Sequence, residues 1–420
     1  MSDFREIDFF TDQTLVNDPY PYYESLRAQC PVQREPHHGA LAVTGYDEVT
    51  EVLRESSVFS NCNAPVGPMI DLPFVPEGDD ISDLIETHRD QFPMYEHLVT
   101  MDQPQHTAHR ELLKRLFTPR RLKENEEFMW RLADSHIDRF HATGKVEIMA
   151  EYAKPFALLT IADLLGVPEE YHREFQIKLG AQQPGPLDEP FVGNPLEFLG
   201  ENFSTWLAER RREPRGDVLT SLATGTFPDG TLPEVAEVVH IATFLFAAGQ
   251  DTTARLLTSA LHILAENPEL QQKLRDQREL IPTFIEETLR LESPVKADFR
   301  LARRTTTVGG VEVPVGSSVM VLLGAANRDP GRFECPAEFR LERPNVREHI
   351  AFGRGAHSCP GAPLARVEAR VSLERMLDRM GDIRISETEH GPADARRWTY
   401  EPTFILRGHN ILHLEYTPIG

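Results

Sequence analysis

A long helical pattern between residues 234 and 266 constrains the fold more than any other feature of the sequence. Apolar residues recur at helical spacing throughout Glu234–Glu266, and one unbroken helix of this length extends about 50 Å at 1.5 Å per residue. Its most apolar run, Ile241–Ala248, is too short and too polar at its flanks to span a bilayer. A helix of this length has to be covered by a large body, so the pattern predicts one large domain with a long central helix.

Helical periodicity also dominates the sequence around this segment. It covers Gln105–Phe117, Leu122–Ala142, Tyr152–Leu165, Glu169–Leu179, Leu196–Arg212, Ile281–Leu291 and Pro363–Met380. Strands and helices do not alternate regularly, which excludes a doubly wound α/β fold. We therefore expect a mainly α fold with small β-sheets (α+β), in a single domain over residues 1–420 whose helical core lies at about 105–292.

The strands that we expect are short and lie outside the helical core. A β-richer N-terminal part covers about 1–60, with a strand pair around Val32–Val43. Val308–Val313 and Val319–Leu323 flank a Pro-Val-Gly turn, which predicts a hairpin between them. Residues 61–100 are rich in Pro, Gly and Asp, and long irregular segments of this kind often act as binding loops.

Charge and cysteine content exclude several classes of protein. With 44 Lys and Arg against 66 Asp and Glu, the net charge is −22, so nucleic acids and anionic membranes are excluded as first partners. The N-terminus has neither the basic region nor the apolar core of a signal peptide. The four cysteines form no CxxC pair, as a zinc or redox motif would require. We expect a cytoplasmic monomer.

Cys359 lies in a glycine-rich segment directly before an amphipathic helical pattern. The segment reads AFGRGAHSCPGAPLAR over residues 351–366. The N–H groups and the dipole at a helix N-terminus stabilise a thiolate, and glycines let the backbone approach a flat, bulky group. A lone cysteine is usually a buried structural residue. The flanking pattern favours a chemical role instead.

Five fixed positions around this cysteine form the pattern F-x-x-G-x-H-x-C-x-G, which arises by chance about once in three million windows. It resembles the haem-thiolate signature of the cytochrome P450 monooxygenases. The resemblance implies the P450 fold, a single large triangular domain, with its cysteine loop at 351–361. It also implies haem b as cofactor, Cys359 as the iron ligand, and the neighbouring haem-binding residues Phe352, Gly353, His357 and Gly361. Pro360, where the family commonly has an aliphatic residue, is a departure that should alter hydrogen bonding to the sulfur more than ligation.

The long helix contains AGQDTT at residues 248–253, which looks like the oxygen-binding helix of the same family. The resemblance makes Asp251 and Thr252 the catalytic acid–alcohol pair that delivers protons during oxygen activation, and it places Ala248 and Gly249 at the cofactor. Considered alone, a threonine in mid-helix usually bonds back to a carbonyl one turn earlier. Gly249 would weaken the helix here and favour a kink that opens a groove.

His106 and Arg110 stand at i, i+4 in an H-x-x-x-R pattern that the family uses to bind haem propionates. The resemblance adds Arg300 and His357 to this set. Two buried propionates need about this many cationic hydrogen-bond donors. Considered alone, the i, i+4 pair would be an ordinary surface pair.

The E-x-x-R pattern at Glu287 and Arg290 matches a further motif of the family, and Arg343 is its matching arginine. Considered alone, such a pair is usually solvated and contributes under about 1 kcal/mol. The resemblance implies that these three residues form a buried structural core rather than a catalytic site.

The resemblance predicts an O2-dependent monooxygenase that receives its electrons from a ferredoxin and a ferredoxin reductase, since 420 residues leave no room for a reductase domain. A basic stretch supports this partner, because Glu111 alone opposes Arg110, Lys114, Arg115, Arg120, Arg121 and Lys123. A charge run is about as often a merely solvated helix face. We expect docking near Arg110, Lys114 and Arg115, because small redox proteins are acidic.

The substrate is expected to be a small hydrophobic molecule, preferably terpenoid- or steroid-like, that becomes hydroxylated. The resemblance places it against residues 61–100, Val192–Leu199 and Glu401–Phe404, and against Phe244, Ala247, Ala248, Val295 and Lys296. Lys296 would pair with a carboxylate, although a loop lysine is more often solvated. A fatty or aromatic acid therefore remains an alternative. So do a haem-thiolate peroxygenase, against which the Asp251-Thr252 pair argues, and a haem sensor or carrier.

Overall fold

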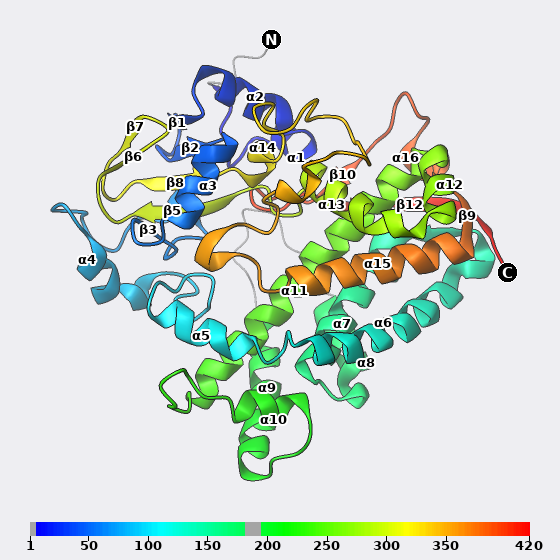
Figure 1. The fold of residues 1–420 in the computed structure, drawn as a ribbon, viewed down its shortest axis with the longest axis horizontal. Coiled ribbons are helices and arrows are strands. Elements are labelled where there is room, and N and C mark those ends of the chain that lie inside the picture. The colour runs from blue at the N-terminus through cyan, green and yellow to red at the C-terminus, as the bar shows by residue number, and fades with distance from the viewer. Residues whose placement is uncertain (1–5, 181–194) are drawn as a thin grey trace. The chain divides into compact units, whose positions relative to one another are not determined.

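The computed structural model describes residues 6–180 and 195–420 (Figure 1). The chain divides into two compact units. Unit 1 comprises Met1–Arg110, Leu289–Cys359 and Pro402–Arg407. Unit 2 comprises Glu111–Thr288, Pro360–Glu401 and Gly408–Gly420. Each unit is therefore assembled from segments that are far apart in the sequence.

A five-stranded sheet forms the centre of unit 1. Its strand order is β1 (Val32–Arg34), β2 (Leu41–Val43), β8 (Ser318–Val321), β5 (Asp298–Ala302) and β3 (Phe59–Ser60). Strands β2 and β8 are parallel, and the other pairs are antiparallel. The predicted strand pair around Val32–Val43 is confirmed as β1 and β2.

Both faces of this sheet are buried, as alternating side chains show. Val319 and Val321 of β8 belong to one apolar cluster, whereas Met320 and Leu322 belong to another. Successive side chains of a strand point to opposite faces, so apolar residues at consecutive positions require cover on both sides. The helices of unit 1 are α1 (Thr14–Asn17), α2 (Tyr20–Gln29), α3 (Tyr46–Arg54), α4 (Ser82–Thr87) and α14 (Leu323–Ala326).

The hairpin predicted between Val308–Val313 and Val319–Leu323 is wrong. The hairpin instead joins β6 (Thr306–Val308) to β7 (Val311–Val313). Its turn residues Gly309 and Gly310 both have positive φ, at 54° and 80°, the conformation that tight two-residue hairpins need. Strand β8 pairs with β2 and β5 instead of β7.

Unit 2 is a bundle of helices around α11 (Val235–Ala265), which confirms the long predicted helix. The N-cap Glu234 and Glu237 form a capping box at its start. Helix α7 (Lys154–Leu165) contacts α11 and is buried nearly all round, as a helix without a polar face must be. The other helices are α6 (Pro119–Phe140), α8 (Glu169–Gly180), α9 (Pro195–Arg212), α10 (Val218–Ala223), α12 (Pro268–Asp276), α15 (Ala362–Arg379) and α16 (Glu387–His390).

Two helices, α5 (Gln105–Leu113) and α13 (Ile281–Leu291), run across the division between the units. Helix α5 ends four residues before the predicted Phe117, and α6 begins three residues before the predicted Leu122. The reason is local, because Pro119 suits the first turn of a new helix. The Thr118 side chain caps that helix by accepting a hydrogen bond from the Arg121 N–H.

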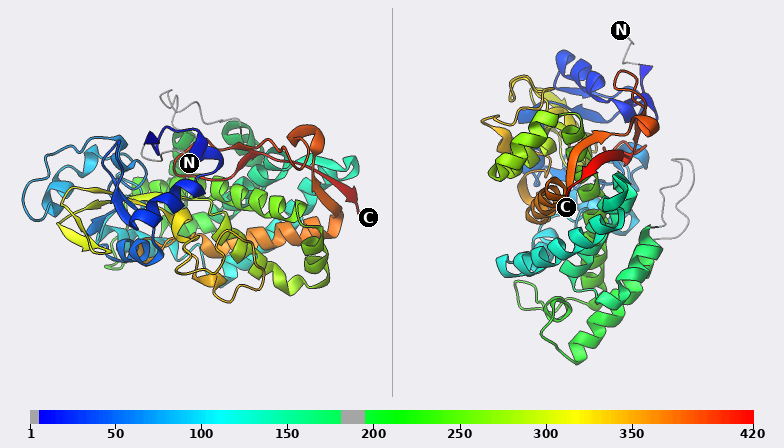
Figure 2. Two further views of the ribbon diagram at one scale, coloured as in Figure 1. Left: turned by 90° about the horizontal axis from the view of Figure 1, so that it is seen from above. Right: turned by 90° about the vertical axis from the view of Figure 1, so that its right-hand side faces the viewer.

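The small sheets of unit 2 lie near the C-terminus. Strand β12 (His413–Pro418) pairs with β4 (Lys145–Glu147) and with β9 (Met380–Ile385), and it leads to the chain end beside β9 (Figure 2). Strands β10 (Thr399–Tyr400) and β11 (His409–Ile411) form a separate pair.

Candidate haem and oxygen-activation site

The cysteine loop of unit 1, residues 350–359, contains a short 3₁₀ turn, Gly355–His357, just before the cysteine. The Cys359 N–H donates to the Phe352 carbonyl oxygen at 2.8 Å, and the Gly353 N–H donates to the Ile350 carbonyl oxygen at 2.9 Å. These bonds close the loop into successive turns. Cys359 stands at the end of the loop with its side chain exposed.

Two glycines determine the course of the loop. Gly353 and Gly355 have φ values of 65° and 73°, in the left-handed region that favours glycine. A Cβ on Gly355 would overlap the main-chain oxygen of Leu53 in α3, whereas a Cβ on Gly353 would meet nothing closer than the His357 oxygen at 4.0 Å. Gly355 is therefore required by conformation and by space, and Gly353 by conformation alone.

Basic side chains gather beside the loop. His106 and Arg110 come from α5, and His357 comes from the loop itself. The two imidazole rings have centroids 3.8 Å apart, with their planes inclined at 31°. Arg110 Nη2 donates to the carbonyl oxygen of Ser358 at 2.5 Å, which ties α5 to the residue before the cysteine.

Arg300 of β5 is a fourth basic group, and it is paired with Asp298 at 2.8 Å. The pKa of His357 is lowered to about 2, first by burial and then by the positive charges of His106, Arg300 and Arg110. The pKa of His106 is lowered to about 4, mainly by burial and by Arg110. Basic groups that oppose one another's protonation in this way are stabilised by an anionic ligand.

The donor set of this cluster fits haem b, which carries two carboxylates and an iron. His106 Nε2 is buried and has no hydrogen-bond partner among the described residues, and such a nitrogen is costly unless a ligand satisfies it. Burial lowers the pKa of Arg110, and the negative charge of a nearby Cys359 thiolate opposes part of that shift. A carboxylate can therefore be bound by the nitrogens while a metal is bound by the nearby sulfur.

In unit 2, helix α11 has an open face at its centre. Residues before and after this part of the helix are largely buried. Ala248, however, is exposed, and Phe244, Ala247, Asp251 and Thr252 are half-buried. These positions follow the i, i+3, i+4, i+7, i+8 spacing of one helix face. The predicted acid–alcohol pair and three predicted pocket residues thus share that face.

The α-helical assignment of α11 runs without a break past Gly249, and the expected kink stays a prediction. A Cβ on Gly249 would lie 3.3 Å from Cγ1 of Ile161 in α7, and the glycine permits close packing of the two helices. The Thr252 hydroxyl donates to the Ala248 carbonyl oxygen at 2.9 Å, which is the common back-bond of a mid-helix threonine.

Comparison with known proteins decides the family. Residues 226–380 match the family profile described as Cytochrome P450. Cytochrome P450 144 of Mycobacterium tuberculosis is 36% identical over 392 residues, which cover 91% of this chain and 87% of that protein. The chain belongs to the cytochrome P450 family. It is accordingly a haem-thiolate monooxygenase, and proteins of this family bind haem b through a cysteine thiolate.

Solved P450 structures confirm the predicted fold class. The substrate-free form of Mycobacterium marinum cytochrome P450 CYP150A6 is 60% identical to this P450, with a TM-score of 0.95 and 100% of both chains covered. CYP109E1 from Bacillus megaterium in complex with corticosterone is 28% identical, with a TM-score of 0.80, 96% of this chain and 99% of that chain covered. The mainly α architecture with small sheets is that of the P450 fold.

The predicted structural residues of the P450 are buried. Glu287 and Arg290 of α13 are both 0% exposed, and Arg343 is 5% exposed. Arg290 donates to the main-chain oxygens of Asn327, Pro336 and Glu338, at 2.9, 2.7 and 3.0 Å. Arg343 donates to those of Glu334 and Glu338, at 2.6 and 3.0 Å. The two arginines therefore hold the irregular chain that precedes the cysteine loop in sequence.

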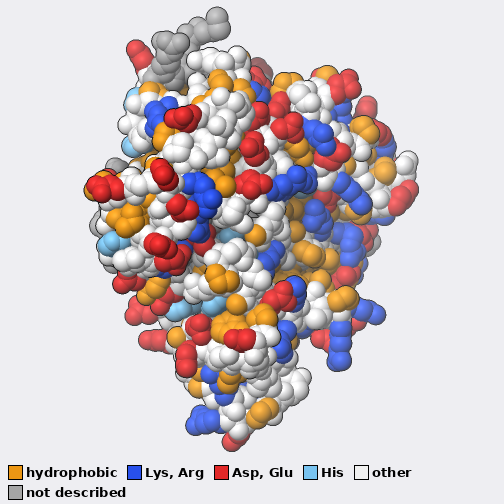
Figure 3. All heavy atoms as spheres, turned by 60° about the vertical axis from the view of Figure 1, so that its left-hand side comes forward, with side chains coloured by type: hydrophobic (Ala, Val, Ile, Leu, Met, Phe, Trp, Pro, Cys, Tyr) orange, Lys and Arg blue, Asp and Glu red, His pale blue; other side chains and the backbone are white. Residues whose placement is uncertain are grey.

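The basic stretch between residues 110 and 123 is less positive at the surface than its sequence indicates. Arg121 is half-buried and pairs with Asp163 at 3.1 Å. Lys114 pairs with Glu111 at 2.5 Å, and Arg120 pairs with Glu124 at 2.9 Å. Four cations of the stretch are exposed, namely Lys114, Arg115, Arg120 and Lys123. Figure 3 shows side chains of both signs interspersed on the face that it presents.

Lys296, which was expected to be solvated more often than not, is 3% exposed. Its main-chain N–H donates to the Ile405 carbonyl oxygen at 2.7 Å, and Val295 bridges to Leu406. The solvated interpretation of Lys296 is therefore wrong. Of the predicted substrate segment Val192–Leu199, the residues before 195 lie outside the described chain.

Sequence reasoning missed two buried polar contacts next to the acid–alcohol pair. Arg255, one helix turn after Asp251, lies between that residue and Glu401. The Thr253 hydroxyl donates to Glu368 at 2.9 Å, and burial raises the pKa of Glu368 to about 8. The i, i+4 spacing of Asp251 and Arg255 was a usable signal. No local signal indicates that Glu401 or Glu368 contacts this part of α11, because both lie more than a hundred residues away in the sequence.

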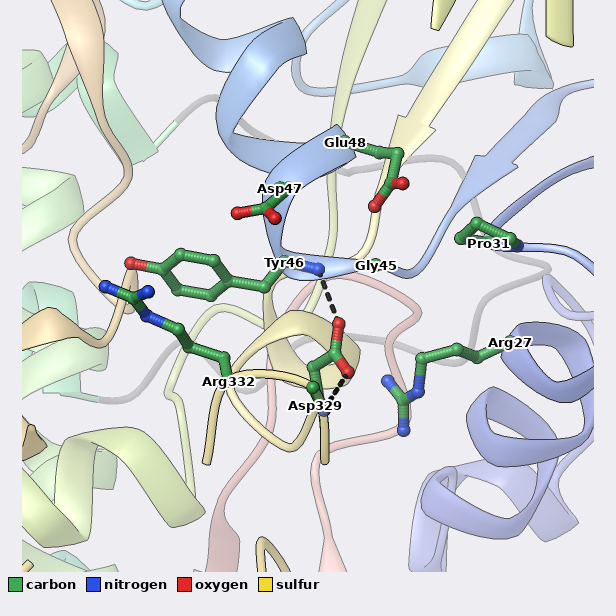
Figure 4. A pocket seen from close by; sticks show the side chains of 9 residues that line it. Arg27, Pro31, Gly45, Tyr46, Asp47, Glu48, Asp329 and Arg332 are labelled. Carbon is green, nitrogen blue, oxygen red and sulfur yellow. Dashed lines mark hydrogen bonds between the residues drawn. The ribbon is translucent and has the colours of Figure 1, made fainter. Parts of the chain in front are cut away.

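A separate pocket of about 380 Å³ lies in unit 1 (Figure 4). Its lining includes Arg27, Asp47, Glu48 and Arg332, and the Tyr46 N–H donates to Asp329 at 2.8 Å on its wall. None of the predicted site residues lines it. Among the described residues, no helix is both long and apolar enough to cross a membrane, and no cluster of three or more His, Cys, Asp or Glu could hold a metal ion.

Proposed function

We propose that Cys359 is the haem ligand of this P450 and that His106, Arg110, Arg300 and His357 bind the haem carboxylates. The observation that carries the proposal is the cluster of basic side chains beside an exposed cysteine. The bound haem supplies the oxygen-activating chemistry. The turns of residues 350–359 hold the sulfur, and residues 1–420 act together as one P450 domain.

Asp251 and Thr252 deliver the protons that this chemistry consumes. The Asp251 side chain is 38% exposed, so it can exchange protons with solvent. The Thr252 hydroxyl donates to the Ala248 oxygen and keeps its lone pairs for a proton passed along the open face of α11. The order of transfer is from solvent to Asp251, and from there to Thr252.

Thr252→Ala tests this assignment. We expect electron consumption to continue while most of the electrons appear as peroxide rather than as hydroxylated product, because proton delivery is impaired. The matched control is Thr243→Ala, since Thr243 makes the same back-bond in the same helix, to the Val239 oxygen at 2.9 Å. Unchanged coupling in Thr252→Ala would contradict the proton-relay role.

The preferred substrate is a small terpenoid- or steroid-like hydrophobe that becomes hydroxylated. The open part of α11 presents Phe244, Ala247 and Ala248, which are apolar and, at the two alanines, small. CYP109E1, a related P450, was solved with corticosterone. Lys296, buried in the loop after α13, supports the alternative of a fatty or aromatic acid.

A ligand screen by Soret shift separates the two substrate classes. We expect steroids or terpenoids to bind more tightly than fatty or aromatic acids, and Lys296→Met to leave their affinity within about twofold. Tighter binding of the acids, lost by tenfold or more in Lys296→Met, would establish the acid alternative, since tenfold corresponds to about 1.4 kcal/mol.

A ferredoxin that docks on the exposed cations near Arg110, Lys114 and Arg115 supplies the electrons. Lys114→Glu with Arg115→Glu should weaken ferredoxin-driven turnover more than peroxide-driven turnover, because only the former requires docking. Arg212→Glu, which reverses an exposed charge at the end of α9, is the matched control. Equal losses with both electron sources would contradict the docking site.

A further inference from the structure

Arg255 of α11 shares one nitrogen between two carboxylates. Its Nη2 lies 2.8 Å from Glu401 Oε2 and 3.4 Å from Asp251 Oδ2. Asp251 is one turn earlier on the same helix, and Glu401 is 146 residues further along the chain. All three residues belong to unit 2.

The two carboxylates differ in their access to solvent. The Glu401 side chain is 3% exposed and the Asp251 side chain is 38% exposed, whereas the Arg255 side chain is 1% exposed. A buried carboxylate depends on its cation, because removing that cation leaves an uncompensated buried charge. A half-exposed carboxylate is screened by water and depends on it less. The guanidinium therefore forms its strong ion pair with Glu401 and only a weak one with Asp251.

The other contacts of the Arg255 guanidinium are weak, so the guanidinium can move toward Asp251. Its Nη1 has a long contact of 3.5 Å with Asn410 Oδ1, and its Nε is buried without a hydrogen-bond partner among the described residues. The stem is confined, since a Cβ on Gly408 would come within 2.7 Å of the Arg255 Cβ. The Glu401 N–H donates to the Gly408 oxygen at 3.1 Å, which fixes the competing carboxylate.

We propose that Arg255 is a positioning residue for Asp251 and that Glu401 sets how firmly it holds that carboxylate. The inference rests on the proposed role of Asp251 in proton delivery. With Glu401 in place, Asp251 is tethered near the open face of α11 but remains free to move between solvent and Thr252. Without the Glu401 charge, Arg255 would hold Asp251 tightly and proton delivery would slow.

The first test is structural and needs no turnover. We expect a crystal structure of the substrate-free Glu401→Gln enzyme to show the Nη2–Oδ2 distance shortened from 3.4 Å to about 2.9 Å, the usual length of a charge-assisted hydrogen bond. Glutamine keeps the shape and an acceptor oxygen at position 401, so the fold should persist. A distance that stays at 3.4 Å or lengthens would overturn the proposal.

The second test measures proton delivery. Glu401→Gln should slow product formation roughly fivefold, equivalent to about 1 kcal/mol, and should raise the solvent deuterium isotope effect. The double variant Glu401→Gln/Arg255→Gln should recover to within about twofold of the wild type, because the tether is then absent. A structural role for the pair would instead make the double variant at least as impaired as the single one.

Glu286→Gln is the matched control. Glu286 is 6% exposed and pairs with Arg366 on α15, so the substitution also removes a buried carboxylate from an arginine pair in unit 2. Its isotope effect should equal that of the wild type. An equal rise in Glu286→Gln would show that any lost buried pair has this effect, and the proposal would be wrong.

Asp251→Asn separates this inference from the proposed function. If Asp251→Asn slows product formation and Glu401→Gln leaves the isotope effect unchanged, Asp251 delivers protons and Arg255 does not position it. If Asp251→Asn leaves coupling intact, the proton role of Asp251 is wrong, and the inference fails with it. The inference is supported when Glu401→Gln adds no further slowing to Asp251→Asn.

Discussion

The haem-binding cluster proposed in unit 1 (the cysteine side) and the open face of α11 in unit 2 (the helix side) are built in different ways. In unit 1, α5, β5 and the loop of residues 350–359 bring one sulfur and four basic side chains together from distant parts of the chain. In unit 2, one face of helix α11 carries Asp251, Thr252 and the predicted apolar pocket residues Phe244, Ala247 and Ala248. The first arrangement depends on turns and on close backbone approach, and the second depends on helical spacing.

This difference determines what a substitution does to each side. On the cysteine side, we expect a change in one basic residue or one glycine to alter cofactor binding or the course of the loop. On the helix side, hydrogen bonds within α11 hold the backbone, so we expect a substitution to change proton delivery or packing and to leave the helix in place. The predictions below test that contrast, from the largest expected effect to the smallest.

Arg110→Ala should cause the largest loss of cofactor binding. It removes the hydrogen bond to the Ser358 oxygen and one cation from the basic cluster, and we expect haem affinity to fall by about 10- to 100-fold. Haem transfer to apomyoglobin measures the affinity. Arg121→Ala, which removes a half-buried arginine paired with Asp163, is the control and should retain haem.

Gly355→Ala should destabilise the protein by about 3 kcal/mol. The alanine would be strained at a positive φ, and its Cβ would also overlap the Leu53 backbone. Gly353→Ala has the same strain without the overlap and should cost about 1 kcal/mol. Denaturant unfolding of the two apoproteins measures the difference. Equal losses would show that the close approach to α3 does not constrain the loop.

Glu368→Gln should stabilise the protein, and the gain should depend on pH. Because burial raises the pKa of Glu368 from 4.5 to about 8, the folded state keeps its proton between these values while the unfolded state has lost it. Native stability therefore falls as pH rises through this window, by up to about 1.4 kcal/mol per pH unit.

The neutral glutamine escapes that loss and can still accept the hydrogen bond of Thr253. Urea unfolding at several pH values should show the advantage of Glu368→Gln growing from near zero at pH 4.5 to about 2 kcal/mol at pH 7. Glu374→Gln, a partly exposed position on the same helix, should show no such trend. A gain independent of pH would contradict the buried, protonated carboxyl.

Gly249→Ala should have the smallest effect. Alanine gains about 1 kcal/mol of helix propensity over glycine, and the added Cβ at 3.3 Å from Ile161 offsets much of this gain. We expect the free energy of unfolding to change by less than about 1 kcal/mol. A large loss would show that the helix side shares the steric constraint of the cysteine loop.

Patterns within short stretches of the sequence predicted the central helix and the cysteine loop. The repeat of apolar residues identified α11, and the spacing of glycine, histidine and cysteine identified the loop around Cys359, because both signals lie within a few tens of residues. The parallel pairing of β2 with β8 was missed, since it joins segments separated by more than 270 residues. The contact between Arg255 and Glu401 was missed for the same reason, because the two residues are 146 positions apart.

One error and one omission were local. The run from Val308 to Leu323 was read as one hairpin, although the glycine pair at 309–310 provides the better turn. At Gly249 the sequence analysis considered only a weakening of α11 and missed the close approach of Ile161. In both cases glycine has several structural uses, and only the neighbours in space decide which one applies.

The central claim is that Cys359 binds the haem iron as a thiolate, and the spectrum of the reduced protein with carbon monoxide tests it most directly. The wild type should show the red-shifted Soret band of thiolate ligation, and Cys359→Ser should lose it while Cys335→Ser, at an exposed cysteine outside the loop, retains it. Absence of the band from folded wild-type protein, or its survival in Cys359→Ser, would contradict the account.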